Sequence, residues 1–243
     1  MRTSEPVPYE WWWIRVTSDN DATGGDRTEG VSVNFTTVVF DLGQVVVDWN
    51  PAKAHPDLSA SEHAEIADLI DFASYNLRAD AGERWSDLDA EVASLWPEHS
   101  GFLLTYARNF PAALVGEIPG TSSLIEELSA LNVRLLGLTN WSSETFPHAA
   151  AAIGVLKHFE AIVVSGAVGL IKPDPAVYRY LVTAHEVVPA QAVFIDDREE
   201  NVTGARRLGF HGVHFTEAAQ LRADLIELGL PLAKDASASR SHD

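Results

Sequence analysis

Several short apolar runs of this chain end in side chains that can do chemistry. Asp41 directly follows one run, and Asp196 and Asp197 follow another. Carboxylates act as nucleophiles, carry protons or bind hard cations, while Thr, Asn and Lys side chains bind and neutralise anions. The sequence therefore predicts one reactive site built from six residues, which are Asp41, Thr139, Asn140, Lys172, Asp196 and Asp197.

These side chains can meet only if the runs before them are neighbouring strands of one sheet. A short apolar run that ends at a glycine or a turn is typical of a buried strand. The runs concerned are residues 37–40, 133–138, 161–164 and 192–195. Ligands of an open parallel sheet bind at the carboxyl ends of its strands. We therefore expect the polar residues at these ends to converge on one pocket, which Lys172 reaches from the loop after the third run.

The second half of the chain alternates helical and strand-like segments. Helices are expected at residues 121–131, 143–153, 175–185 and 199–208, and a last strand at 212–215. Alternation of this kind predicts an α/β fold with a doubly wound parallel sheet. Residues 51–110 carry helical periodicity and no strand signal. They predict a helical cap inserted after the first strand, over the carboxyl edge of the sheet.

The expected domain organisation follows from these segments. The core domain comprises residues 35–49 and 118–230, and the helical cap comprises residues 50–117. Residues 1–34 contain a polar stretch rich in Gly and Asp, which is typical of a poorly ordered leader. Residues 231–243 are expected to form a frayed polar tail.

The net charge restricts the possible partners. The chain has 35 Asp and Glu against 17 Lys and Arg, a formal charge of −18. Nucleic acid and anionic membrane surfaces demand cationic protein surface, so both are excluded as partners. A small phosphorylated ligand is not excluded as a partner, because one lysine and a metal ion can neutralise its charge locally.

Cysteine usage and the absence of long apolar stretches narrow the remaining classes. The chain has no cysteine, which excludes disulfides, thiolate metal sites and a cysteine nucleophile. No stretch approaches the roughly 18 apolar residues that span a bilayer, and the N-terminus lacks the pattern of a secretory signal. We therefore expect a cytoplasmic protein. The oligomeric state stays open.

Four motifs occur in the order found in the haloacid dehalogenase-like (HAD) hydrolase superfamily, which the chain resembles over residues 36–227. They are Phe40-Asp41-Leu42-Gly43, Leu138-Thr139-Asn140, Ile171-Lys172-Pro173-Asp174-Pro175 and Phe194-Ile195-Asp196-Asp197-Arg198-Glu199-Glu200-Asn201. The resemblance is strongest to the phosphatase branch whose first motif reads Asp-Leu-Gly and whose small helical cap follows the first strand. Some members of that branch act on sugar phosphates.

The resemblance implies a Mg²⁺-dependent phosphomonoesterase that acts on a small phosphorylated metabolite. Asp41 would attack phosphorus in line and form an aspartyl-phosphate, which water then hydrolyses. The implied metal ligands are the Asp41 carboxylate, the Gly43 backbone carbonyl and Asp197, with Asp196 as a second ligand or outer partner. Asn201, one helical turn after Asp197, would orient these groups.

The phosphoryl group has its own set of implied partners. Thr139 and Asn140 would donate hydrogen bonds to its oxygens, and Lys172 would neutralise the charge that develops on it.

One position departs from the resembled pattern. Phosphatases of the superfamily usually carry a second Asp two residues after the nucleophile, as general acid and base, and this chain has Gly43 there. A missing acid costs about 10²–10⁴ in rate for a poor leaving group. We therefore predict that activated esters and acyl phosphates are turned over better than simple alkyl phosphates. A metal-bound water, a cap residue or Asp48 are the candidates to replace the acid.

Two other functions stay open at this point. A 2-haloacid dehalogenase would use the same Asp41 to attack carbon without a metal, although the paired acids Asp196 and Asp197 would repel a carboxylate substrate. A non-catalytic module that captures a phosphorylated ligand is the second alternative, and Gly43 is the feature that favours it. Dependence of activity on a metal separates the first alternative from a phosphatase. Ligand binding without product formation identifies the second.

Overall fold

Five parallel strands form the central sheet of the computed structural model, which describes residues 35–233. Their order is β5-β4-β1-β6-β7. They comprise β1 (Thr37–Phe40), β4 (Arg134–Thr139), β5 (Ala161–Val164), β6 (Ala192–Asp196) and β7 (His211–His214). Because β1 lies in the middle, Asp41 emerges at the centre of the carboxyl edge. The expected leader at residues 1–34 and residues 234–243 of the tail expected at 231–243 lie outside the described residues.

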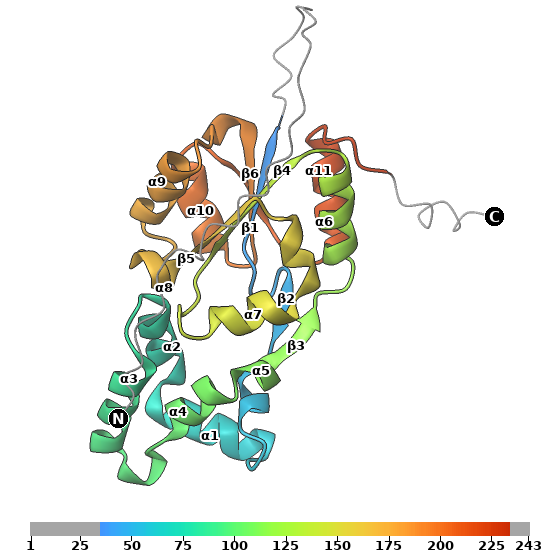
Figure 1. Cartoon of the computed structure of the whole chain (residues 1–243). Coiled ribbons are helices and arrows are strands. Elements are labelled where there is room, and N and C mark those ends of the chain that lie inside the picture. Colours follow the sequence, from blue (N-terminus) through green and yellow to red (C-terminus); the bar gives the residue numbers. More distant parts are fainter. Residues whose placement is uncertain (1–34, 234–243) are drawn as a thin grey trace, which may run out of the picture.

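Helices cover both faces of this sheet, which confirms the predicted doubly wound fold (Figure 1). On one face lie α6 (Thr121–Ala130) and α11 (Ala218–Glu227), and on the other lie α9 (Pro175–Ala184) and α10 (Glu199–Arg207). The helices α7 (Phe146–Ala152) and α8 (Ser165–Val168) lie at the carboxyl end of the sheet (Figure 1). Alternate residues of β1 divide the core. Val38 and Phe40 pack on the side of α6 and α11, and Val39 packs on the side of α9 and α10. Residues buried on both faces explain why the strand sequences are continuously apolar.

Residues 51–113, which we call the cap segment, form a group of helices beyond the carboxyl edge of the sheet (Figure 1). They are α1 (Ala60–Ile70), α2 (Phe72–Asp80), α3 (Trp85–Leu95), α4 (Phe102–Arg108) and α5 (Phe110–Ala113), with 3-10 turns at Pro51–Ala54 and Pro97–His99. Ser59 begins α1 with a reciprocal capping box to Glu62, a signal present in the sequence. The predicted insertion of a helical segment after the first strand is thereby confirmed.

A two-stranded antiparallel ribbon, which the sequence did not predict, connects the cap segment to the sheet. It consists of β2 (Val47–Trp49) and β3 (Leu114–Glu117), with Val47 opposite Glu117. The Asn50 N–H donates to the Ala113 carbonyl at 2.9 Å, so the cap segment begins and ends at neighbouring positions. Strands of three and four residues carry too little periodicity to be recognised in a sequence.

Several predicted boundaries are wrong by one to three residues. The helix expected from residue 143 begins at Phe146, because Ser142 starts a turn in which its carbonyl accepts the Thr145 N–H at 3.2 Å. The last strand covers His211–His214, one residue earlier than expected. Helix and strand ends depend on local hydrogen bonds that residue types alone do not determine.

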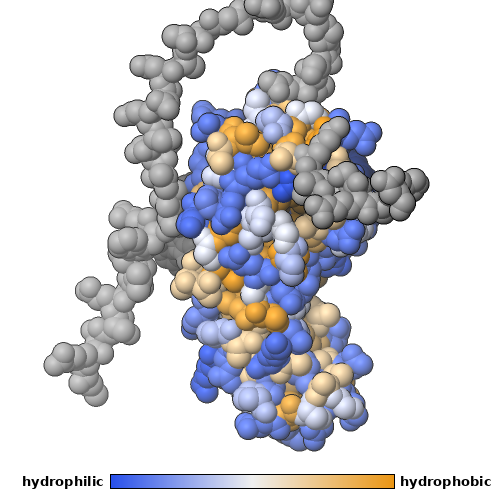
Figure 2. Space-filling model, turned by 90° about the vertical axis from the view of Figure 1, so that its right-hand side faces the viewer, coloured by the Kyte–Doolittle hydropathy of each residue, from blue (hydrophilic) through white to orange (hydrophobic). Residues whose placement is uncertain are grey.

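The described surface is mixed in character. Figure 2 shows mainly hydrophilic residues on one face, with hydrophobic residues in small patches between them. Among the large apolar side chains that are exposed, Leu69, Leu77 and Leu95 lie on three different helices of the cap segment. Within residues 35–233, none of the helices combines the length and the apolar character needed to cross a bilayer.

Candidate active site

Asp41 stands at the point where β1 leaves the sheet. Its backbone N–H donates to the Ile195 carbonyl at 2.8 Å, which extends the pairing with β6 by one residue and fixes the side chain at the edge. The Oδ1 atom accepts from the Leu42 N–H at 2.7 Å and lies 2.9 Å from the Lys172 Nζ. Among the described residues no hydrogen bond reaches Oδ2, so this oxygen is available to a reacting group.

Lys172 is the cation of the site, and all three of its N–H bonds are used. Its Nζ donates to the Leu138 carbonyl at 2.8 Å, to Asp196 Oδ2 at 2.7 Å and to Asp41 Oδ1 at 2.9 Å. The side chain is only 2 % exposed, so an ammonium group is stable there only because these acceptors surround it. The geometry places its charge beside the predicted nucleophile.

Asn140 holds the backbone of Lys172 in place. Its Oδ1 accepts from the Lys172 N–H at 2.8 Å, and its Nδ2 donates to the Lys172 carbonyl at 3.0 Å. Asp174 caps α9 directly after this loop through the Ala176 N–H, and Pro175 occupies the first turn of that helix. Asn140 thus positions the lysine, and its predicted contact with a phosphoryl oxygen stays a prediction.

Asp196 is fully buried and holds other groups of the site. Its Oδ2 accepts from Lys172, and its Oδ1 accepts from the Arg198 N–H and from Asn201 Nδ2, both at 2.9 Å. The sequence-based role of Asn201 as an orienting residue agrees with this contact. Asp197, by contrast, is half-buried. Asp197 is therefore the more accessible carboxylate of the pair.

Burial and charge shift the pKa values of the site. Burial raises the pKa of Asp41 to about 7, and the charges of Asp196 and Asp197 add to the rise while Lys172 opposes it. Burial alone would lower the pKa of Lys172, but the charges of Asp41 and Asp196 outweigh it and raise that pKa. The lysine therefore stays an ammonium ion. A second cation beside Asp41 would lower its pKa and favour the ionised form at neutral pH.

Three carboxylates offer the oxygen ligands that Mg²⁺ prefers. Single oxygens of Asp41, Asp196 and Asp197 all lie within 4.8 Å of one another. These three negative charges face the single ammonium of Lys172, which leaves two charges that a divalent cation would cancel. Mg²⁺ typically binds one or two carboxylates and keeps waters or phosphate oxygens as its other ligands. The donor set therefore fits this ion.

Thr139 and Gly43 complete the predicted set. Thr139 ends β4 and is 1 % exposed, and its buried Oγ1 has no hydrogen-bond partner within the described residues. A buried hydroxyl without a partner is costly, and an anion with free oxygens would satisfy it. A side chain placed at Gly43 would start in open space, since no atom lies within 4 Å of its Cβ position.

Two contributors to the site were not recognised in the sequence. Ser165, directly after β5, accepts from the Trp141 N–H at 2.9 Å and so fixes the loop that follows Thr139 and Asn140. The sequence showed Ser165 at the end of a strand-like run, which is the signal that could have found it. Asp80 arrives from α2, and no motif of the sequence marks it.

Gly166 is required by the same loop. A methyl group there would lie 2.6 Å from the Ser143 nitrogen and 2.8 Å from the Trp141 carbonyl oxygen, closer than such atoms can approach. We expect Gly166→Ala to displace the loop and to lower kcat/KM by about 10²-fold. Steady-state kinetics test this, with Gly154→Ala as the control, because Gly154 does not have a left-handed φ and a methyl group on it would meet only the Glu117 side-chain oxygen at 3.8 Å. An unchanged kcat/KM in Gly166→Ala would contradict the prediction.

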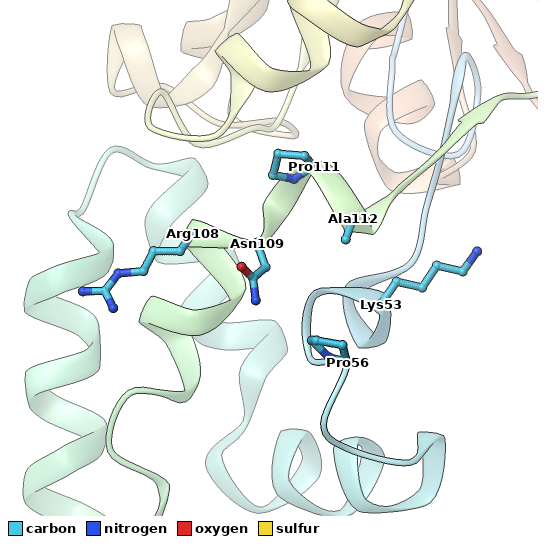
Figure 3. Close-up of a pocket in the computed structure, with 6 residues that line it drawn as sticks. All are labelled: Lys53, Pro56, Arg108, Asn109, Pro111 and Ala112. Atoms are coloured by element: carbon cyan, nitrogen blue, oxygen red, sulfur yellow. The ribbon is translucent and has the colours of Figure 1, made fainter.

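A hollow of about 360 Å³ on the cap segment does not belong to this site. Lys53, Pro56, Arg108, Asn109, Pro111 and Ala112 line it (Figure 3). The Lys53 and Arg108 side chains point away from each other and do not converge on an anion. In the carboxylate cluster itself, Asp41 is only 7 % exposed and Asp196 is fully buried, whereas Asp197 is half-buried.

The fold and the cluster define a class: a doubly wound hydrolase fold with carboxylates and a lysine at the strand ends and a helical insertion after the first strand. A family model described as haloacid dehalogenase-like hydrolase matches residues 38–214. The chain belongs to this family, as its four motifs predicted.

Known proteins are similar to this chain in sequence or in fold. A sesquiterpene phosphatase of Aspergillus oryzae is 25 % identical over 201 residues, covering 80 % of this chain and 96 % of that protein. Two solved structures share the fold. A HAD family enzyme of Bacteroides thetaiotaomicron, in complex with magnesium and inorganic phosphate, aligns with a TM-score of 0.59 and 16 % identity over 76 % of this chain and 96 % of its own. The L-2-haloacid dehalogenase of Xanthobacter autotrophicus aligns with a TM-score of 0.58 and 21 % identity over 79 % and 83 %.

Proposed function

We propose that this protein is a Mg²⁺-dependent phosphomonoesterase that uses Asp41 as its nucleophile. The observation that carries the proposal is the group of three carboxylates with metal-ligand spacing, which lies at the same sheet edge as the unpartnered hydroxyl of Thr139. A bound cation would compensate the negative charge of the carboxylates, and a phosphoryl oxygen would accept a hydrogen bond from the Thr139 hydroxyl. The Aspergillus relative is named as a phosphatase and matches this chain over nearly its whole length, which supports the same reaction class.

The residues of the chain divide the chemistry between them. The free Oδ2 of Asp41 attacks phosphorus, and the bond from phosphorus to the leaving oxygen breaks. Lys172 stays ionised beside Asp41 and neutralises the charge that builds up, while Thr139 donates to a phosphoryl oxygen. Water then attacks the phosphorus of the aspartyl-phosphate and releases phosphate. When bound, Mg²⁺ cancels the charge that keeps an anionic ester away from an anionic nucleophile.

The substrate proposed is a small phosphorylated metabolite. The Asp-Leu-Gly motif resembles that of phosphatases acting on sugar phosphates, whereas the Aspergillus relative is named for a sesquiterpene substrate. Asp41 is only 7 % exposed, so we propose that the cap segment moves before a substrate enters and again after it has bound, which would exclude water during the reaction. Specificity is therefore proposed to reside in the cap segment.

The dehalogenase alternative fits the site less well. Three carboxylates around one lysine would repel the carboxylate group of a 2-haloacid. Displacement of halide from carbon also needs no metal ion, so it does not account for carboxylates with metal-ligand spacing. The similarity to the Xanthobacter enzyme, at 21 % identity, concerns the fold alone.

Removal of the metal is the experiment that tests the proposed function. Phosphate release from sugar phosphates, a prenyl phosphate and p-nitrophenyl phosphate is measured with Mg²⁺ and with EDTA. We expect release to fall to background in EDTA and to return when Mg²⁺ is restored. Full activity in EDTA, or halide release from a 2-haloacid, would favour the dehalogenase. Protection against thermal unfolding by phosphate without turnover of any ester would favour a binding module.

A further inference from the structure

A buried carboxylate that the proposed mechanism does not use reaches the site from the cap segment. Asp80 is the last residue of α2 and is only 8 % exposed. Its Oδ2 accepts from Asn76 Nδ2 at 3.0 Å, one turn earlier on the same helix. A carboxylate is rarely buried so far without a salt-bridge partner unless its position serves a purpose.

The core holds Asp80 against the loop that follows β4. Ser165 Oγ donates to the Asp80 carbonyl at 2.5 Å and accepts from the Trp141 N–H, so one hydroxyl ties the end of α2 to this loop. The Ser142 N–H donates to the Asp80 carboxylate itself. Since Ser142 lies two residues after Asn140, the carboxylate is placed beside the residues predicted to bind the phosphoryl group.

Glycines permit this close contact between cap segment and core. Gly82 has a φ of +106°, and a methyl group on it would lie 3.2 Å from the Gly166 carbonyl oxygen. Without a side chain at Gly82, the end of α2 can pack directly on the segment after β5.

Asp80 is electrostatically part of the same cluster. The pKa of Asp80 is raised to about 7: burial is the main cause and the Asp41 charge adds to it, while the Ser142 N–H and the Lys172 ammonium oppose the rise. From the cap segment itself, Asn76 and Tyr106 face it, and the Asp80 charge contributes to a raised pKa of Tyr106. A carboxyl group with these surroundings can both give and take a proton near neutral pH.

We propose that Asp80 supplies the general acid and base that Gly43 cannot supply. The inference rests on the proposed phosphatase function. As the Asp41 Oδ2–P bond forms and the ester P–O bond breaks, the electron pair left on the departing oxygen takes the Asp80 proton. In the second step the oxygen of water bonds to phosphorus, the Oδ2–P bond breaks, and the water proton passes to Asp80, which restores its starting state.

A leaving-group series tests this role. Wild type and Asp80→Asn are compared in Mg²⁺ on p-nitrophenyl phosphate, phenyl phosphate and an alkyl phosphate. Asparagine keeps the shape of the side chain and can still accept from the Ser142 N–H, but it carries no proton to give. We expect kcat on p-nitrophenyl phosphate to fall by less than about tenfold, and kcat on the alkyl phosphate to fall by about 10²–10⁴. The wild type is still expected to turn over activated esters better than alkyl phosphates. Its rates should depend less steeply on the pKa of the leaving group than those of Asp80→Asn.

A purely structural role of Asp80 gives a different result. Loss of a packing contact would slow all three substrates by one common factor or would raise KM alone, and either outcome overturns the proposal. Asp89→Asn is the matched control, because Asp89 is equally buried in the cap segment but accepts from the Gly101 and Leu103 N–H groups away from the cluster. Its leaving-group dependence is expected to equal that of the wild type.

A second variant tests the role of Asp80 independently of the leaving-group series. Gly43→Asp introduces a carboxylate where the chain leaves open space. Added to Asp80→Asn, it is expected to increase turnover of the alkyl phosphate by at least tenfold. No increase would mean that a missing acid is not the defect of Asp80→Asn.

Failure of the role proposed for Asp80 can be told apart from failure of the proposed phosphatase function. Turnover that depends on Asp41 but shows no selective loss in Asp80→Asn overturns only the role of Asp80, whereas turnover that survives Asp41→Asn overturns the phosphatase mechanism.

Discussion

Asp41→Asn is expected to abolish phosphate release from every substrate, with a loss of at least about 10⁴ in kcat. An amide has no anionic oxygen to attack phosphorus, and it can no longer form the aspartyl-phosphate. The change is isosteric, so the Lys172 and Leu42 contacts to the side-chain oxygen at position 41 can persist. Single-turnover phosphate release in Mg²⁺ measures the loss. A residual rate within tenfold of wild type would show that another group is the nucleophile.

The same variant has a predictable effect on stability. Because the folded state raises the pKa of Asp41 from 3.8 to about 7, it binds this proton more tightly than the unfolded chain does. Its contribution to stability is therefore present below about pH 4 and is lost as the pH rises through about 7. In EDTA at pH 8, Asp41→Asn should melt no lower than wild type. A clear drop in melting temperature would mean that the ionised carboxylate stabilises the metal-free fold.

Lys172→Met is expected to damage both catalysis and stability. The ammonium group contacts two buried carboxylates, and methionine leaves Asp41 and Asp196 without their cation. Removal of one partner from a buried ion pair typically costs about 3–5 kcal/mol, and loss of a stabilising charge in the transition state costs about 10²–10³ in kcat. Urea unfolding at pH 8 and steady-state kinetics in Mg²⁺ measure the two effects.

The pH dependence of Lys172→Met distinguishes lost charge from lost packing. At pH 5 the uncompensated Asp41 carboxyl, whose pKa is already raised by burial, takes up a proton, so the destabilisation relative to wild type should be smaller than at pH 8. Lys157→Met, which changes an exposed lysine, serves as the control and should alter stability by less than about 0.5 kcal/mol at either pH. Equal destabilisation by Lys172→Met at both pH values would assign the effect to packing.

The sequence predicted the sheet and most of its reactive edge for identifiable reasons. The inner strands β4, β1 and β6 are buried on both faces, so they contain apolar runs such as residues 38–40, and each run ends at a polar residue. The parallel fold then requires these ends to meet, and Asp41, Lys172 and Asp196 are in direct contact.

The remaining parts depend on contacts between distant segments. Asp80 lies 85 positions before Ser165, and nothing in its neighbours along the chain indicates that it packs beside the loop after β4. Its importance appears only when the end of α2 is placed against the core. The exchange of hydrogen bonds between Asn140 and the Lys172 backbone is equally invisible in the sequence, because it depends on the path of a loop.

The ribbon of β2 and β3 makes the cap segment an exchangeable unit. The chain leaves the core and returns to it through two adjacent strands, with Asn50 bonded to Ala113 where they meet. To the sheet, residues 51–113 are equivalent to the loop of one hairpin, and the entropy cost of closing a loop grows only slowly with its length. An insertion of different size or shape could therefore be grafted between the same two strands while Asp41, Lys172 and Asp196 keep their places. Such a graft would also replace Asp80, so it would change proton transfer together with substrate choice.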